Sequence, residues 1–294
     1  MPKSDWHIHT HNSCDCTKIG RSMEERIEEL KTAGITDFGF SDHVHTFYNY
    51  PREIAASRRE FDETLARHPE LKGHMHFGIE LSVMSEWEVD IIEHERVPAD
   101  SLPYGYTYGL RTGGPSGTSP TMCLNDEIVQ RYGIEYVVAG VHWGLYCYQD
   151  ENSVWEDYRR QYLTAVANPH TDVLAHWLWW WNDAPKDMPN LFYDFAKVPQ
   201  TLKDDLAAAL KIYDTAFELN SGEINPNNPA HAPGYVREYL AYAKRLQESG
   251  VRLTFGSDTH GAYRTNVTER VDPLLREAGI DPDSLWVFPA KPEK

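Results

Sequence analysis

The segment "DWHIHTHNSCDC" (residues 5–16) combines a short strand-like pattern with a row of histidines almost at the start of the chain. His7, His9 and His11 stand at alternate positions, and Asp15 follows six residues after His9. Side chains two residues apart on a strand point to the same face. Two interpretations compete: a histidine-rich segment on a solvent-exposed face, or the first corner of a metal site. The strands that follow decide between them.

Short apolar runs of this kind recur along the chain, and most end in a polar residue able to do chemistry. Continuous apolar runs are typical of parallel strands that are buried on both faces. The runs are "DWHIHTH" (5–11), "TDFGFSDH" (36–43), "HMHFGIEL" (74–81), "IEYVVAGVH" (134–142), "TDVLAHW" (171–177), "DTAFELN" (214–220) and "VRLTFGSD" (251–258).

Amphipathic helical patterns lie between the apolar runs, at residues 22–34, 52–68, 153–168, 200–213, 235–250 and 267–278. The first and third are predicted to begin with capping boxes, Ser22 with Glu25 and Ser153 with Glu156. Pro273 is predicted to end or kink the last helix. Seven strand–helix alternations predict an α/β fold, a parallel barrel or a relative of one, as a single domain over 1–294. Loop insertions are expected near 98–121 and 177–199.

Composition narrows the range of partners. The chain has 294 residues and a formal net charge of −17, which argues against a nucleic-acid partner. Bound cations can reverse the field inside a pocket, so a phosphorylated substrate stays open. No apolar run is long enough for a membrane span or a signal segment, so a cytoplasmic protein with no membrane partner is expected. Four cysteines are too few for a disulfide scaffold, and we interpret Cys14 and Cys16 as reduced thiols rather than metal ligands.

Nine imidazole or carboxylate groups are expected to meet at one mouth of the barrel, because the carboxyl ends of parallel strands converge there. Each group alone is more often structural than functional. Burying so many together without a cation would be costly, however, so the set predicts a metal site. The nine are His7, His9, Asp15, His43, Glu80, His142, His176, Asp258 and His260.

The motifs that carry these groups resemble, in order and spacing, those of the polymerase and histidinol phosphatase (PHP) superfamily. They are "DWHIHT" (5–10), "SDH" (41–43), "GIE" (78–80), "GVH" (140–142), "AHW" (175–177), "ELN" (218–220) and "GSDTH" (256–260). The resemblance implies a distorted (β/α)7 barrel of PHP type, similar to a TIM barrel. It also implies a cluster of two or three transition-metal ions that hydrolyses phosphate esters.

Three metal positions follow from the resemblance. The first would be held by His7, His9, Glu80 and Asp258. The second would be held by Glu80, His142 and His176, with Glu80 bridging. The third would be held by Asp15, His43 and His260, where many members have histidine in place of Asp15.

Other residues near these motifs are expected to support the metal ligands or to have no part in the site. The resemblance makes Glu218 and Asn220 supporting residues rather than ligands. Asp5 is expected to steady an imidazole. His11 and His45 have no counterpart in the motifs and are expected in loops near the substrate. The histidines expected outside the mouth are His68, His74, His76, His94 and His170.

The mixed nitrogen and oxygen donors favour zinc, manganese or iron over magnesium alone. Closely spaced metal ions would supply a metal-bound hydroxide for in-line attack on phosphorus. Glu80 would bridge the metals, and Asp258 or His260, acting through water, or a metal-bound water would protonate the leaving group.

Residues that bind the organic part of a substrate are sought in the loops after the strands. Arg111, Lys186 and Arg264 are candidate cations there, and Trp179 and Trp180 form an aromatic wall or a cap on the barrel rim. The favoured function is a phosphatase of a small soluble phosphate ester. Two alternatives stay open: the same site hydrolysing a phosphodiester, lactone or amide, and a non-catalytic metal-binding or proofreading module. The sequence does not indicate the oligomeric state.

Overall fold

Seven parallel strands form the centre of the protein. The structure is a computed structural model, and it describes residues 2–16, 18–94, 117–145, 150–179, 191–263 and 266–288. Hydrogen bonds join the strands in the order β1-β2-β3-β6-β7-β8-β9, and every neighbouring pair is parallel. All seven predicted strands are therefore confirmed. Their bounds are β1 (Ser4–Ile8), β2 (Asp37–Val44), β3 (Met75–Ser82), β6 (Tyr136–Gly140), β7 (Val173–Leu174), β8 (Ala216–Asn220) and β9 (Leu253–Gly256).

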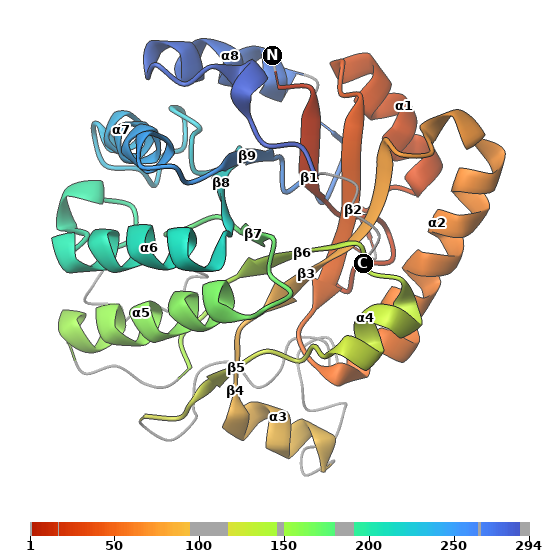
Figure 1. The fold of residues 1–294 in the computed structure, drawn as a ribbon, viewed down its shortest axis with the longest axis horizontal. Helices are drawn as coiled ribbons and strands as arrows, with labels where there is room; N and C mark the ends of the chain where they lie inside the picture. Colours follow the sequence, from red (N-terminus) through yellow and green to blue (C-terminus); the bar gives the residue numbers. More distant parts are fainter. Residues whose placement is uncertain are drawn as a thin grey trace.

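The sheet curls until its last strand returns to its first. Ile8 forms a parallel bridge with Thr259, just beyond β9. The amide of Asp258 donates to the carbonyl of His7 at 2.8 Å, and that of His9 donates to the carbonyl of Thr259 at 3.2 Å. Because β7 has only two paired residues, the ring is uneven. The prediction of a distorted seven-stranded barrel is confirmed (Figure 1).

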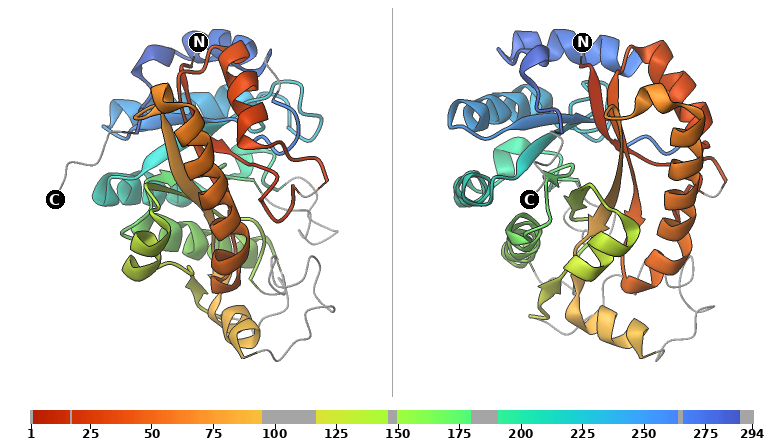
Figure 2. Two further views of the ribbon diagram at one scale, coloured as in Figure 1. Left: turned by 90° about the vertical axis from the view of Figure 1, so that its right-hand side faces the viewer. Right: turned by 45° about the vertical axis from the view of Figure 1, so that its right-hand side comes forward.

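Helices surround this ring (Figures 1 and 2). The α-helices are α1 (Met23–Ala33), α2 (Ala55–Arg67), α3 (Glu86–Glu93), α4 (Asp126–Tyr132), α5 (Glu151–Ala167), α6 (Gln200–Tyr213), α7 (Tyr235–Glu248) and α8 (Asn266–Glu277). Shorter helical turns cover Phe47–Asn49, Tyr50–Ile54, Pro69–Leu71, Phe195–Lys197 and Pro282–Ser284. One apolar cluster packs α5, α6 and α7 against β6–β9, and another packs α1 and α2 against β1–β3.

Two predicted helix boundaries differ from those in the structure. The first helix does begin at the Ser22 capping box, but α5 begins earlier than expected. Asp150 is its N-cap and accepts from the Ser153 amide, because aspartate with an extended backbone caps a helix well. The last helix does not end at Pro273, since the buried side chains of Val271 and Leu275 anchor it on both sides of the proline.

The connection between the third and fourth barrel strands holds elements that the sequence did not predict. A two-stranded antiparallel sheet pairs β4 (Met84–Ser85) with β5 (Pro120–Thr121), and α3 and α4 flank it. Most of the predicted loop at 98–121 lies outside the described residues, as does the central part of the loop at 177–199. Within the described residues, no helix combines the length and apolar character that a membrane crossing requires.

An aromatic layer fills the barrel interior directly below the strand ends. The Tyr136 ring crosses this interior and its hydroxyl donates to the carbonyl of Trp6 at 3.0 Å. Gly39 and Gly78, on the two adjacent strands, face this ring, and a Cβ at either position would overlap it. Two residues after Gly78, Glu80 lies on the same face of β3, so this packing supports the layer that carries Glu80.

Replacing Gly78 with alanine should therefore destabilise the barrel, because the ring has no room to move away from the new methyl group. We expect a loss of roughly 1–3 kcal/mol in the free energy of unfolding, measured by urea denaturation. Gly261→Ala is the matched control, since a Cβ there meets open space. Equal stability of the two variants would contradict this packing.

Candidate metal centre

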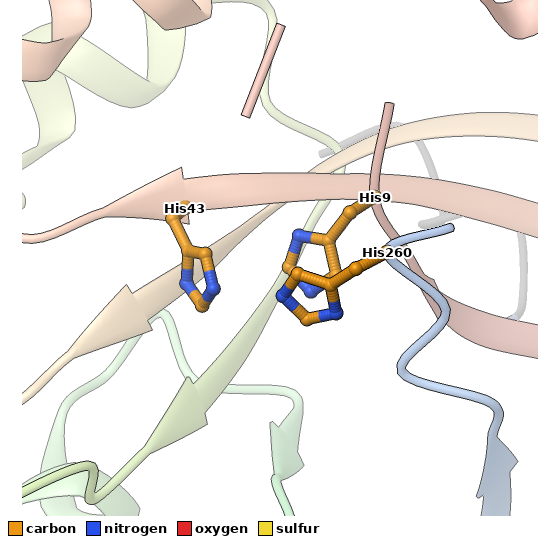
Figure 3. Close-up of side chains that lie close together, drawn as sticks. All are labelled: His9, His43 and His260. Carbon is orange, nitrogen blue, oxygen red and sulfur yellow. The ribbon is translucent and has the colours of Figure 1, made fainter. Parts of the chain in front are cut away.

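The structure brings all nine predicted metal-type side chains to the carboxyl edge of the ring of strands. His43 and Glu80 lie within β2 and β3 and are direct register partners. His7 lies within β1, and the others follow the ends of β1, β6, β7 and β9 or, for Asp15, stand in the loop after β1. Figure 3 shows three of the imidazoles, those of His9, His43 and His260, facing one another although they come from opposite ends of the chain.

Glu80 is the centre of this group, and one of its oxygens faces three imidazoles. Its side chain is completely buried. Its Oε2 lies 3.2 Å from His7 Nε2, 3.3 Å from His9 Nε2 and 2.8 Å from His43 Nδ1. Asp258 joins on the same side, with Oδ1 at 3.2 Å from His9 Nε2 and 3.4 Å from His7 Nε2. The donor atoms of His7, His9, Glu80 and Asp258 all lie within 4.8 Å of one another, which suits a single cation.

The other oxygen of Glu80 faces two further imidazoles. Its Oε1 lies 2.9 Å from Nε2 of both His142 and His176. Burial disfavours the charged form of His142 and lowers its pKa to about 4, so this ring is neutral at pH 7 and offers a lone pair. Glu80 can thus serve two positions at once, as a bridging carboxylate would.

A third group of donor atoms lies towards the solvent. Asp15 Oδ2 is 2.7 Å from His260 Nε2 and 3.3 Å from His43 Nε2. The rings of His9 and His43 stack at 4.5 Å, and these two histidines with His260 also fall within one ligand sphere. Asp258 holds a left-handed backbone at φ 53°, a conformation that costs energy in a non-glycine residue and concentrates at functional sites.

The hydrogen bonds of His7 test whether this centre suits a cation. Its Nδ1 lies 2.7 Å from Glu218, and a carboxylate only accepts, so Nδ1 carries the hydrogen. Its Nε2 then faces carboxylate oxygens of Glu80 and Asp258 without a hydrogen bond to either. A lone pair pointed at two carboxylates is repulsive unless a proton or a metal ion lies between them. The residues therefore fit a metal.

Electrostatics agree with this conclusion. Burial alone would lower the pKa of His7 and His43, but the nearby carboxylates raise both well above the ordinary value. Burial alone would raise the pKa of Glu80, but His43, His7 and His142 hold it well below its ordinary value. Without metal, protons occupy the cluster, so metal binding should release them.

Glu218 and Ser82 orient the proposed ligands from behind. Besides holding His7, Glu218 accepts from the His176 amide at 2.6 Å, and it is buried. Ser82 Oγ lies 2.9 Å from His142 Nδ1 and 2.7 Å from His45 Nδ1. The supporting role that the sequence suggested for Glu218 agrees with these contacts.

The expectation for Asp5 was wrong. Its carboxylate accepts from the amides of His7 and Ser257 and from the Tyr263 hydroxyl, and no imidazole in the described part of the chain bonds to it. A strand advances about 3.3 Å per residue, so Asp5 lies one layer too deep to reach the His7 ring. Asp5 instead ties β1 to the residue after β9.

Other histidines separate into two groups. His11 lies at the surface, with its ring 3.3 Å from Glu60, whereas His45 is fully buried and lines the cavity at the cluster. Each histidine expected outside the mouth pairs with a carboxylate elsewhere. The pairs are His68 with Glu24, His74 with Asp37, His76 with Glu135, His94 with Asp90 and His170 with Asp126.

Sequence reasoning missed Arg26, whose side chain is fully buried although it lies on α1. Its guanidinium donates to the carbonyls of His9, Thr259, Gly261 and His260. It therefore fixes the chain segments that carry three proposed ligands. An arginine on an amphipathic helix gives no sequence signal for such a role.

Asp42, in the "SDH" motif, was also missed. It accepts from the amide and hydroxyl of Thr10, at 2.6 and 2.7 Å, and from the Ser57 hydroxyl at 2.6 Å. It thus fixes the chain directly after His9. Asp42 stands beside His43 in the motif, and neighbouring strand residues point to opposite faces. This position was the available signal that Asp42 faces away from the ligands and supports the strand.

Two cavities meet at the cluster. One of about 280 Å³ is lined by proposed ligands and Trp179, and a second of about 530 Å³ extends over the ends of β8 and β9 to Arg270. Trp179, Asp258 and His260 line both. The Trp179 ring lies 5.3 Å from the His176 ring and 5.7 Å from that of His142. The other candidate substrate residues, Arg111, Trp180, Lys186 and Arg264, lie outside the described residues.

Comparisons with known proteins support the fold, and several of the matching proteins are named as phosphatases. No family model matches the chain. Two proteins named as probable phosphatases, from Thermoanaerobacter sp. (strain X514) and Thermoanaerobacter pseudethanolicus, are each 23% identical to it over 150 residues. The match covers 51% of this chain and 51% of each relative, so the chain spans about half the length of the curated relatives it matches.

Solved structures match over more of the chain. Histidinol phosphate phosphatase from Lactococcus lactis, complexed with zinc, L-histidinol and phosphate, has a TM-score of 0.61 and 18% identity. That match covers 98% of this chain and 97% of the other. A proposed histidinol phosphatase from Listeria monocytogenes has a TM-score of 0.54 and 11% identity, over 88% of this chain and 96% of the other. These likenesses establish a shared fold.

Glu218→Gln tests the support of His7. A carboxamide has one accepting oxygen and a donating NH2, so it cannot accept from both the His7 ring and the His176 amide. Zinc affinity, measured by competition with a chromophoric chelator, should fall about 10- to 100-fold. Glu135→Gln is the matched control, because that carboxylate holds His76 away from the cluster. Unchanged affinity in Glu218→Gln would contradict the role.

Proposed function

We propose that this chain is a metal-dependent phosphatase of the PHP superfamily that hydrolyses a small, soluble phosphate monoester. One observation carries the proposal: a buried carboxylate, Glu80, surrounded by five imidazoles whose nitrogen atoms lie within 3.3 Å of its oxygens. The phosphatase names of the matching relatives and structures support the same reaction class. We also propose a cytoplasmic setting; the three described cysteines are not joined in disulfides.

The proposed ligands divide into three positions around Glu80. His7, His9 and Asp258 would bind one cation with Glu80, His142 and His176 a second with Glu80, and Asp15, His43 and His260 a third. Two or three zinc, manganese or iron ions bound here would activate a water molecule and neutralise the phosphate oxygens during attack.

The chain's own residues would orient the substrate and supply the proton. Asp258 or His260, acting through water, or a metal-bound water is the proposed proton donor, and the side chains of Asp258 and His260 keep 22% and 29% of their exposure whereas Glu80 has none. His260 Nδ1 donates to the backbone carbonyl of Asp258 at 3.0 Å, because a carbonyl oxygen only accepts. Its Nε2 therefore faces Asp15. The leaving group would occupy the larger cavity, next to Trp179.

One observation favours a second candidate function. Among the described residues that line the 280 Å³ cavity there is no lysine or arginine, and Arg270 lines only its neighbour. Metal ions alone would have to neutralise a phosphate dianion there. A phosphodiester, or a lactone or amide that carries less charge, would suit the same centre.

The decisive experiment is a substrate screen on protein stripped with chelator and reloaded with zinc, manganese or iron. Phosphate monoesters should be hydrolysed faster than phosphodiesters, lactones or amides. Glu80→Gln should lose at least one metal equivalent and about 100-fold or more in kcat/KM, because the amide cannot bridge two cations. Glu24→Gln, which alters a surface partner of His68, is the control. Full metal content and turnover in Glu80→Gln would refute the bridging role.

A second experiment concerns substrate preference. Trp179→Ala removes a ring that lines both cavities without removing a proposed ligand. For the preferred substrate, kcat/KM should fall by about tenfold or more, since contacts to the leaving group contribute in the transition state. Hydrolysis of a small generic ester and the metal content should change much less. If both substrates lose activity equally and the melting temperature falls, Trp179 only packs the rim.

A further inference from the structure

Cys16 lies against the third proposed metal position. Its side chain is fully buried, and its Sγ is 3.4 Å from Asp15 Oδ1. The other oxygen of Asp15 faces His260 and His43. One donor atom each from Asp15, Cys16 and His260 can be chosen so that all three lie within 4.8 Å of one another. The thiol therefore reaches the same ligand sphere as two of the proposed ligands.

The loop around Cys16 holds the thiol in this place. Its amide donates to the Ser13 carbonyl at 3.0 Å, and its own carbonyl accepts from the amides of Ile19 and Gly20. A Cβ at Gly20 would lie 2.8 Å from that of Cys16, so the turn closes tightly over it. A side chain fixed by its backbone in this way is already placed for coordination.

Asp15 and His260 would share a cation at the third position with Cys16, and His43, whose Nε2 is 3.3 Å from Asp15, lies beside them without belonging to the ligand group that contains Cys16. Zinc is most often bound by four ligands in a tetrahedron, and thiolate is among the donors it prefers. Manganese and magnesium prefer oxygen donors instead. A sulfur ligand at this position would thus decide which metal occupies it, which the nitrogen and oxygen donors alone leave open.

We propose that Cys16 binds the third cation as a thiolate beside Asp15 and His260, and so makes this position selective for zinc or iron(II) over manganese. This inference rests on the proposed metal centre, and it reverses the interpretation of Cys16 from the sequence. On binding, a sulfur lone pair forms the bond to the cation, and the thiol proton passes to solvent. The competing arrangement is a neutral thiol that only donates a hydrogen bond to Asp15, alongside Ser13.

Cys14 and Cys123 provide matched controls. Cys14 belongs to the same loop, but its Sγ lies 3.5 Å from His45 Nε2 and belongs to none of the ligand groups among the described residues. Cys123 is buried between β5 and α4, where its carbonyl accepts from the Tyr50 hydroxyl. Serine at either position removes a thiol without altering the proposed ligand set.

Cobalt(II) is the probe for the experiment, because thiolate–cobalt bonds absorb in the near ultraviolet and protein-bound cobalt absorbs in the visible range. Chelator-treated protein is titrated with cobalt under reducing, oxygen-free conditions, and bound metal is counted by elemental analysis. The unaltered chain, Cys14→Ser and Cys123→Ser should show both absorptions. Cys16→Ser should lose the near-ultraviolet band, keep the visible one, and bind its last zinc ion at least about tenfold more weakly, with manganese affinity nearly unchanged.

Zinc-edge X-ray absorption of the unaltered protein tests the proposal even if the Cys16→Ser variant fails to fold. A sulfur neighbour at about 2.3 Å, retained in Cys14→Ser, would support the proposal, whereas nitrogen and oxygen neighbours alone at about 2.0–2.2 Å would overturn it. Cobalt that binds stoichiometrically without the near-ultraviolet band would also overturn it and leave the metal centre intact. If no cobalt, zinc or manganese binds, the metal centre itself fails, and the thiolate ligand with it.

Discussion

Glu80 is a fully buried carboxylate, and the arrangement of the strand ends depends on what surrounds it. Taking one charge out of water costs several kcal/mol even after the protein relaxes, so the fold must supply compensation within a few ångströms. Five imidazoles lie at that distance, but neutral imidazoles present lone pairs as well as hydrogens. His7 shows the difficulty most clearly, because a neutral imidazole has a single N–H, and that of His7, at Nδ1, is already bonded to Glu218. A cation shared between Glu80 and the imidazoles would resolve the conflict for all of them.

The barrel positions Glu80 and its partners through the pairing of its strands and through the side chains that pack around them. Pairing of His43 with Glu80 sets two ligands at one level, and the Tyr136 layer beneath prevents Glu80 from sinking into the interior. At the seam, where β1 and β9 are joined by few hydrogen bonds, Arg26 holds the carbonyls of His9 and of residues 259–261. This seam is therefore reinforced by a buried side chain from the first helix, and that is where Asp258 and His260 must be placed accurately.

The strands and the nine metal-type groups could be predicted because each lies where a local pattern ends. An apolar run fixes a strand, and the first polar residue after it falls at the mouth of a parallel barrel. The Ser22 helix start was equally local. What could not be predicted depends on contacts between distant segments. Asp5 bonds to Ser257, and Glu218, which was expected only in a supporting role, bonds to His7; neither partner has a signature in the sequence near it. The start of α5 was misjudged because Asp150 and Ser153 are both good caps and only the backbone chooses between them.

The solvent exposure of the proposed ligands increases from the buried centre around Glu80 towards the cavities. The side chains of His7, His9 and Glu80 keep at most 1% of their exposure, whereas Asp15 keeps 17%, Asp258 22% and His260 29%. A cation held between Glu80 and the buried imidazoles would exchange slowly, because the cluster must open to release it. The side chains of the proposed third position face the cavities, so a cation there would exchange most readily and lie nearest to an incoming substrate. Selectivity for one metal would therefore matter most at this outer position, where burial would contribute least to retention and the choice of ligand atoms most.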